Sequence, residues 1–113
     1  KFDILHAVAK EALARLDLFR PMEVCNIAWA HAAMAVDAPA LFRRIAQRAI
    51  AEISRLTPRD LSGLAWAFAT LNARDEDLFR AIAGEAALKM EAFSLQDLAH
   101  LAWALASLGL ADR

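Results

Sequence analysis

Residues 61–79 read LSGLAWAFATLNARDEDLF, and two similar apolar stretches centred on a tryptophan lie elsewhere in the chain. The tryptophans are Trp29, Trp66 and Trp103, and consecutive ones are 37 residues apart. Other positions keep this spacing, among them Pro21 with Pro58. A fixed period of a few tens of residues is typical of repeat folds, in which each unit buries its apolar face on its neighbours. The stretch therefore predicts an internal repeat.

The repeat frame extends over all 113 residues. Residues 1–19 fit as half a repeat, residues 20–56 and 57–93 as full repeats, and residues 94–113 as a partial repeat. We therefore expect a single helical-repeat domain, and we expect it to be a fragment of a longer array.

Each repeat is predicted to contain two helices, called here the A helix and the B helix. Thr57 and Pro58 supply an N-cap oxygen and a first-turn proline. Asn72 follows as a residue that tolerates the left-handed conformation after a helix. Ser94 and Gly109 mark the same two points one repeat later. These signals predict A helices over about residues 21–34, 58–71 and 95–108.

The B helices are predicted to be amphipathic, since apolar residues recur along them at intervals of three and four. In the first full repeat these residues are Leu41, Phe42, Ile45, Ala49 and Ile53. The A helices are apolar nearly all round and need cover on several sides, which stacked helix pairs provide. The sequence therefore predicts an all-α fold, an α-solenoid of stacked helix pairs with a 37-residue repeat and about six helices.

The composition is that of a folded globular domain, with 59% hydrophobic and 24% charged residues. Polar residues interrupt the apolar runs, so we expect no membrane-spanning helix. Cys25 is the only cysteine, which excludes an internal disulfide. The sequence contains no arrangement typical of a catalytic, metal or cofactor site, so we expect neither enzymatic activity nor a small-molecule substrate. The formal net charge of -1 is unusual for a nucleic-acid-binding domain.

Three stretches carry a resemblance to a known family: FSLQDLAHLAWALASLG, LTPRDLSGLAWAFATL and LFRAIA. Together they resemble the octotricopeptide repeat and the related helical repeats of FAST-kinase-like and RAP-domain proteins. The resemblance covers essentially the whole chain. It implies a helix-pair solenoid in the mitochondrion or chloroplast. Its expected partner is organellar mRNA or rRNA, which it would bind to support stability, processing, translation or association with ribosomes.

The tryptophans allow two interpretations. As identical residues in every repeat, Trp29, Trp66 and Trp103 are suited to holding neighbouring repeats together, because large aromatic side chains dominate packing area. In an open groove they would instead be platforms on which RNA bases stack. The sequence favours the packing interpretation.

On the tryptophan side of each A helix the other residue types change from repeat to repeat. The opposite side is predicted to form the core, and in the first full repeat it comprises Val24, Ile27, Ala28, His31 and Met34. Varying polar side chains suit a protein that reads one RNA base per repeat, although ordinary solvated surface explains them equally well. Asn26, Gly63 and His100 form the best such row. Further RNA-binding candidates are Met22, Arg59, Gln96, Thr70, Ser107 and Arg48.

Two functional hypotheses follow from these features. The first is an RNA-binding repeat module of an organellar gene-expression factor, in which the A helices line a groove for single-stranded RNA. The second is a protein–protein scaffold that uses the same groove within a large assembly.

Overall fold

The computed structural model describes residues 2–108, with side chains from residue 4 onward. This part of the chain contains six α-helices and three short 3-10 helices, without any β-strand, so the predicted all-helical fold is confirmed. In chain order the elements are α1 (Phe2–Ala14), η1 (Leu16–Leu18), α2 (Pro21–Ala33), α3 (Pro39–Ala51), η2 (Ile53–Arg55), α4 (Pro58–Thr70), α5 (Glu76–Leu88), η3 (Met90–Ala92) and α6 (Leu95–Ser107).

The elements recur with the period of the sequence. Helices α1, α3 and α5, the B helices, begin at residues 2, 39 and 76, so each starts 37 residues after its counterpart. Helices α2, α4 and α6, the A helices, begin at residues 21, 58 and 95 and keep the same interval. The 3-10 helices were not predicted. They end each B segment, and Ile53 lies in η2 rather than in α3.

The predicted caps explain where the A helices begin. Thr57 Oγ1 accepts a hydrogen bond from the Asp60 backbone N–H at 3.1 Å, and the Asp60 carboxylate accepts one from the Thr57 N–H at 3.1 Å. Ser94 accepts in the same way from the Asp97 N–H at 3.0 Å. These bonds satisfy first-turn donors that have no partner within the helix.

The A helices end in a left-handed residue, as expected at Asn72, whose φ is 54°. Ala35 occupies the equivalent position after α2 with a φ of 56°. The next such position, Gly109, lies outside the described residues. In both turns the closing hydrogen bonds form a Schellman motif, as in the 2.8 Å bond from the Ala73 N–H to the Phe68 carbonyl.

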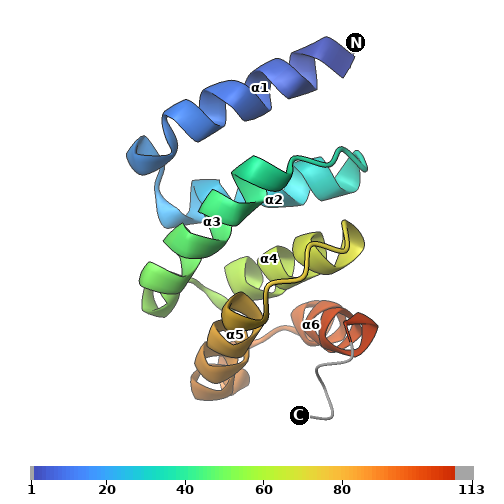
Figure 1. Ribbon diagram of the computed structural model, residues 1–113. Helices are drawn as coiled ribbons and strands as arrows, with labels where there is room; N and C mark the ends of the chain where they lie inside the picture. The colour runs from blue at the N-terminus through green and yellow to red at the C-terminus, as the bar shows by residue number, and fades with distance from the viewer. Residues whose placement is uncertain (1, 109–113) are drawn as a thin grey trace.

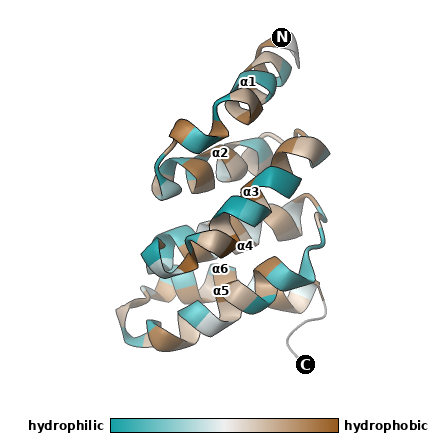
Figure 2. Cartoon of the chain, turned by 60° about the vertical axis from the view of Figure 1, so that its left-hand side comes forward, coloured by the Kyte–Doolittle hydropathy of each residue, from teal (hydrophilic) through white to brown (hydrophobic). Residues whose placement is uncertain are grey.

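The helices pack in two rows (Figure 1). In one row α4 contacts both α2 and α6, and in the other α3 contacts both α1 and α5. Contacts between α2 and α3 and between α4 and α5 join the two rows. Apolar side chains fill the space between them, including Phe42, Ile45, Leu64, Phe68 and Ile82, all less than 4% exposed. Along α3 the ribbon carries broad hydrophilic bands, as expected of an amphipathic helix with one side in water (Figure 2).

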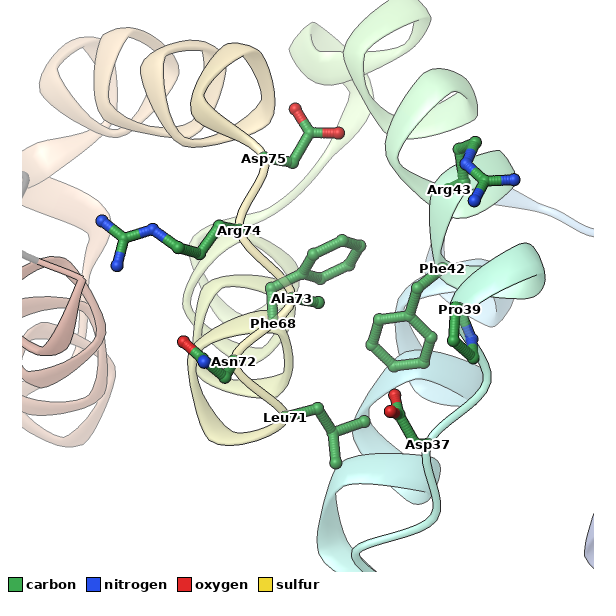
Figure 3. Close-up of a pocket in the computed structure, with 10 residues that line it drawn as sticks. All are labelled: Asp37, Pro39, Phe42, Arg43, Phe68, Leu71, Asn72, Ala73, Arg74 and Asp75. Atoms are coloured by element: carbon green, nitrogen blue, oxygen red, sulfur yellow. The ribbon is translucent and has the colours of Figure 1, made fainter.

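The core prediction is wrong at Met34, which is 62% exposed. Its counterpart Leu71 is half-buried because it packs against the hydrophobic core, and it lines a pocket together with Asp37 of the α2–α3 loop and Pro39 of α3 (Figure 3). Within the described residues no such loop covers Met34, which follows the last residue of α2. The other predicted core residues of α2 are buried or half-buried.

Cations near the ends of α3 and α5 bind backbone carbonyls of the preceding repeat. Arg48 donates from Nη1 to the Leu16 carbonyl at 2.6 Å and from Nη2 to the Phe19 carbonyl at 2.5 Å. Lys89 Nζ donates to the Leu56 carbonyl at 2.6 Å. Leu56 is the counterpart of Phe19 one repeat later. Each cation therefore fixes one repeat on the loop before it with charge-assisted hydrogen bonds.

These two inter-repeat contacts use opposite charge orders. Arg48 Nε lies 2.9 Å from Glu52, and Lys89 Nζ lies 3.0 Å from Glu85, both at a spacing of four residues. Glu85 stands at the position of Arg48 and Lys89 at the position of Glu52. The charges are exchanged, yet the cation reaches one equivalent carbonyl in both repeats, that of Phe19 or of Leu56.

Candidate functional site

A row of aromatic rings crosses the three A helices. The ring centroids of Trp29 and Trp66 are 6.2 Å apart with an interplanar angle of 33°. Those of Trp66 and His100 are 6.4 Å apart with an angle of 40°. These separations lie within the range of direct aromatic contact. The rings therefore link α2, α4 and α6 side by side.

The tryptophans differ in burial. Trp66 is half-buried and packs against the hydrophobic core. Trp29 is 51% exposed and Trp103 is 48% exposed, although both rings are large and apolar. The predicted packing role fits Trp66 in particular, while the exposed surface of the outer two rings is available to a ligand.

The predicted polar row lies on the same face. Asn26 is exposed, and Gly63 and His100 are half-buried at equivalent points of successive A helices. A Cβ built at Gly63 would meet no atom within 4 Å, so the row is open at its centre. The other A-helix candidates are all exposed: Met22, Arg59, Gln96, Thr70 and Ser107. The structure thus brings the candidates of the A helices to one face. Arg48 is the exception, because it lies in α3.

Arg48 lies in α3, where its guanidinium is engaged with two backbone carbonyls and with Glu52. Its side chain is 16% exposed. Those contacts account for the arginine as an inter-repeat link, so we do not place it in the candidate binding face.

The candidate face carries little positive charge. Arg59 is the single lysine or arginine in the described helices α2, α4 and α6. The carboxylates of Glu23, Asp60 and Asp97 accept hydrogen bonds near the starts of these helices and are already engaged. Any ligand must therefore be held mainly by rings and uncharged polar groups.

A pocket of about 330 Å³ lies between the α2–α3 and α4–α5 loops (Figure 3). Phe42 and Phe68 line it, with ring centroids 4.8 Å apart. Two polar residues of its rim are engaged: Asp75 accepts from the Leu78 N–H, and Arg74 donates to the Leu108 carbonyl. The sequence analysis missed this pocket, because its lining comes from the start of α3, the end of α4 and the loops beside them and has no motif of its own.

Two residues of α2 that could carry chemistry, His31 and Cys25, are buried in the core. His31 is 2% exposed, which confirms its predicted place in the core, and its Nδ1 lies 2.9 Å from the Ile27 carbonyl. Burial, and secondarily the charge of Asp60, raises the pKa of the Cys25 thiol to about 12. Cys25 therefore lacks the thiolate character of a reactive cysteine. The described residues contain no cluster of three potential metal ligands.

These features define the class: an all-helical protein whose elements recur every 37 residues and whose A helices carry an exposed, charge-poor aromatic face. A family model described as RNA-editing substrate-binding complex 6 protein (RESC6) matches residues 1–112. The chain belongs to this family. No curated protein and no solved structure matches it significantly. None of the described helices is long and apolar enough to cross a membrane.

The family match overturns the resemblance to octotricopeptide, FAST-kinase-like and RAP-domain proteins. The motifs behind that resemblance are small apolar residues around a tryptophan and an amphipathic Leu-Phe-x-x-Ile-Ala segment. Helices that pack closely against like helices need such residues in any family, so the motifs do not distinguish one family from another.

Proposed function

We propose that this chain is a segment of an α-solenoid that binds single-stranded RNA along the face of α2, α4 and α6, as a component of an RNA-editing assembly. The observation that carries the proposal is the half-exposed aromatic row of Trp29, Trp66 and His100, with Trp103 beside it. The two rows of contacting helices and the 37-residue recurrence of every element support the solenoid. The printed description of the family supports an RNA substrate.

Stacking suits a face with few charges. A base stacked on an aromatic side chain contributes about 1–3 kcal/mol, and every base has a ring face that can stack. Asn26, His100 and Gln96 lie on the same face and can hydrogen-bond to base edges. With Arg59 as the single cation of the A helices, we expect affinity that depends weakly on salt.

The same low charge favours a second candidate, a protein-binding scaffold. Tryptophan is enriched at the centres of protein interfaces, where charged residues are depleted. In that case a protein subunit of the assembly would cover Trp29 and Trp103. Both candidates are binding functions, and we propose no catalytic role, cofactor or small-molecule substrate. We also propose that the protein works in the mitochondrion. Determining where the tagged full-length protein localises in the cell tests this proposal. The family match gives no support to a chloroplast location.

The decisive experiment separates RNA stacking from packing. We expect Trp29→Ala and Trp103→Ala to weaken binding to a randomised single-stranded RNA pool by roughly 1–3 kcal/mol each, with little change in melting temperature. Trp66→Ala should lower the melting temperature sharply, because it removes a ring packed on the core. Leu88→Ala, at an 81% exposed residue of α5, is the matched control and should change neither quantity.

Base selection is tested at the polar row. His100→Asn should change the preferred nucleotide at one position of the selected RNA while the fold and salt dependence stay intact. Gly63→Ala should stabilise α4 and also disturb RNA binding, because it fills the open centre of the row. Gly84→Ala in α5 has equal space around it and should stabilise without affecting RNA. If the parent selects no RNA and instead captures a protein subunit through Trp29 and Trp103, the scaffold function replaces this one.

A further inference from the structure

The loops that follow α2 and α4 carry opposite charges at one repeat position. Arg74, in the α4–α5 loop, donates from Nη2 to the Leu108 carbonyl at 2.7 Å and so ties this loop to the end of α6. One repeat earlier the same position is Asp37, and the counterpart of Leu108 is Leu71. An ionised carboxylate has no hydrogen to donate to a carbonyl, so the corresponding tie to the end of α4 is not formed. The pocket of about 330 Å³ lies at this place, with Asp37 and Leu71 in its lining (Figure 3).

Two hydrogen-bond acceptors of the pocket are unused. The Asp37 carboxylate makes no hydrogen bond or ion pair with any described residue. The turn after α4 closes on the carbonyls of Phe68 and Ala69, and no residue in the described part of the chain donates to the Leu71 carbonyl. The pocket therefore offers a carboxylate and a carbonyl to a donor from outside.

The other charged residues of the pocket do not satisfy these acceptors. Arg74 is engaged at the end of α6, and its guanidinium points away from the two phenylalanine rings (Figure 3). Arg43 lies at the other end of the pocket from Asp37 (Figure 3). The second carboxylate, that of Asp75, already accepts from the Leu78 N–H. The free charge at the Leu71 end of the pocket is therefore negative.

We propose that this pocket binds an arginine side chain of a partner protein. The guanidinium would pair with Asp37 and donate to the Leu71 carbonyl, as Arg74 donates to the Leu108 carbonyl one repeat later. A guanidinium suits both acceptors at once, because its donors form a rigid fork. The apolar stem would lie on Pro39 and Leu71, lining residues that the fold leaves exposed or half-buried. Ligand sites begin at about 300 Å³, so the pocket is of a size for one long side chain.

The position of the pocket favours an occupant from outside the repeat stack. Its walls belong to two consecutive repeats that already pack on each other, through α2 with α4 and α3 with α5. Repeats in an array contact only their neighbours, so further repeats would stack beyond the ends and leave this pocket open. The proposal does not rest on RNA binding, because none of the three tryptophans lines the pocket.

Binding of Nα-acetyl-arginine amide to the 113-residue chain tests the proposal, with Nα-acetyl-citrulline amide as the matched control. Citrulline has nearly the shape of arginine but no charge. We expect the arginine amide to shift the amide NMR resonances of residues 37 and 71–73 with a Kd of about 1–10 mM, as suits one ion pair open to water. The citrulline amide should bind at least tenfold more weakly. Asp37→Asn should abolish the preference for arginine, whereas Arg43→Gln should not weaken it.

Asp37→Arg provides a test that needs no ligand. The introduced side chain should donate to the Leu71 carbonyl as Arg74 does to that of Leu108. We therefore expect the melting temperature to rise by a few degrees and the arginine amide no longer to bind. Asp37→Ala is the comparison, because it also removes the carboxylate but adds no donor, and it should not raise the melting temperature.

Equal binding of the two amides, or no shift of these resonances by either at about 20 mM, would overturn the proposal. So would a loss of binding in Arg43→Gln with Asp37→Asn unaffected, since the pocket would then hold an anion. Shifts of the same resonances by adenosine monophosphate but not by the arginine amide would assign the pocket to RNA instead. Each of these outcomes leaves the tests at Trp29 and Trp103 unaffected.

Discussion

At the scale of single residues, Cys25 and Ser62 show how one position adapts to a neighbouring carboxylate. Ser62 Oγ donates to Asp97 Oδ1 at 3.2 Å, across the contact between α4 and α6. Cys25 is its counterpart in α2. Burial is the larger cause of the raised pKa of its thiol, and the charge of Asp60 raises that pKa further. The protonated thiol is therefore the form that the fold stabilises.

We expect ionisation of this thiol to lower the free energy of unfolding at alkaline pH. Its pKa is about 12 in the folded chain against an ordinary value of 9.0 for a thiol, so the unfolded chain loses the proton first. The free energy of unfolding should therefore be fully retained below pH 9 and decline as the pH rises toward 12. Cys25→Ser should remove this contribution, because a serine hydroxyl does not ionise there and can donate to Asp60. Urea unfolding of both proteins from pH 7 to 11 measures the difference; equal slopes would contradict it.

Ala35 adopts a conformation that costs an alanine more than a glycine. Its φ of 56° is left-handed, where Cβ approaches the backbone at a cost of roughly 1 kcal/mol. Ala35→Gly should therefore stabilise the chain by about 0.5–1 kcal/mol, measured by chemical denaturation. Asn72→Gly is the comparison, since asparagine tolerates φ near 54° and should gain less. A loss of stability at residue 35 would show that the alanine methyl group makes a compensating contact.

The left-handed turn was predictable at Asn72 and missed at Ala35 for a physical reason. Asparagine is enriched in this conformation, so its residue type alone is a signal, whereas alanine carries none. Only the shared repeat position connects the two residues. The repeat alignment therefore predicts the left-handed backbone at Ala35, which the residue type alone does not.

At the scale of the helix, the exchanged ion pairs of α3 and α5 set Arg48 apart from the other RNA-binding candidates. Arg43, Arg44 and Arg48 form a basic cluster in the sequence, and the counterpart of Arg48 is the acidic Glu85. A signal did exist in the pair spaced by four residues, since Arg48–Glu52 and Glu85–Lys89 are mirror arrangements. What could not be predicted is that both cations reach carbonyls more than 30 residues earlier, because that contact exists only after the repeats have packed.

A charge exchange tests this link directly. Arg48→Glu should destabilise the chain by roughly 2–4 kcal/mol, because two carbonyls lose charged donors and Glu52 gains a like-charged neighbour. Adding Glu52→Lys recreates the order found at Glu85 and Lys89, so the double variant should recover most of the lost stability. Thermal or urea unfolding measures both. Additive losses in the double variant would mean that lysine at position 52 does not reach the carbonyls.

At the scale of the whole molecule, periodicity predicted the helices more closely than it predicted their ends or partners. The A helix expected at residues 58–71 is observed as Pro58–Thr70, because caps and packing agree at its boundaries. Met34 was assigned to the core by the same pattern and is exposed. The pattern assumes that every repeat has neighbours on both sides, and this assumption fails at the first repeat described. For the same reason the sequence predicted that the tryptophans form a row but not how deeply each is buried. Trp66 packs on the core, whereas Trp29 and Trp103 are exposed.

Deleting residues 1–37 tests whether stability is distributed over the repeats. The deletion removes α1 and α2 but leaves the contacts of α3 with α5, of α4 with α6 and of α4 with α5. It also exposes the side of α4 that carries Ala67 and takes from Arg48 the carbonyls of Leu16 and Phe19. In a stack of nearest-neighbour units the remainder should stay helical and unfold cooperatively with lower stability. The urea m-value should fall by roughly a third, in line with the surface no longer buried. Complete loss of the helical circular dichroism signal would instead mean that the six helices share one indivisible core.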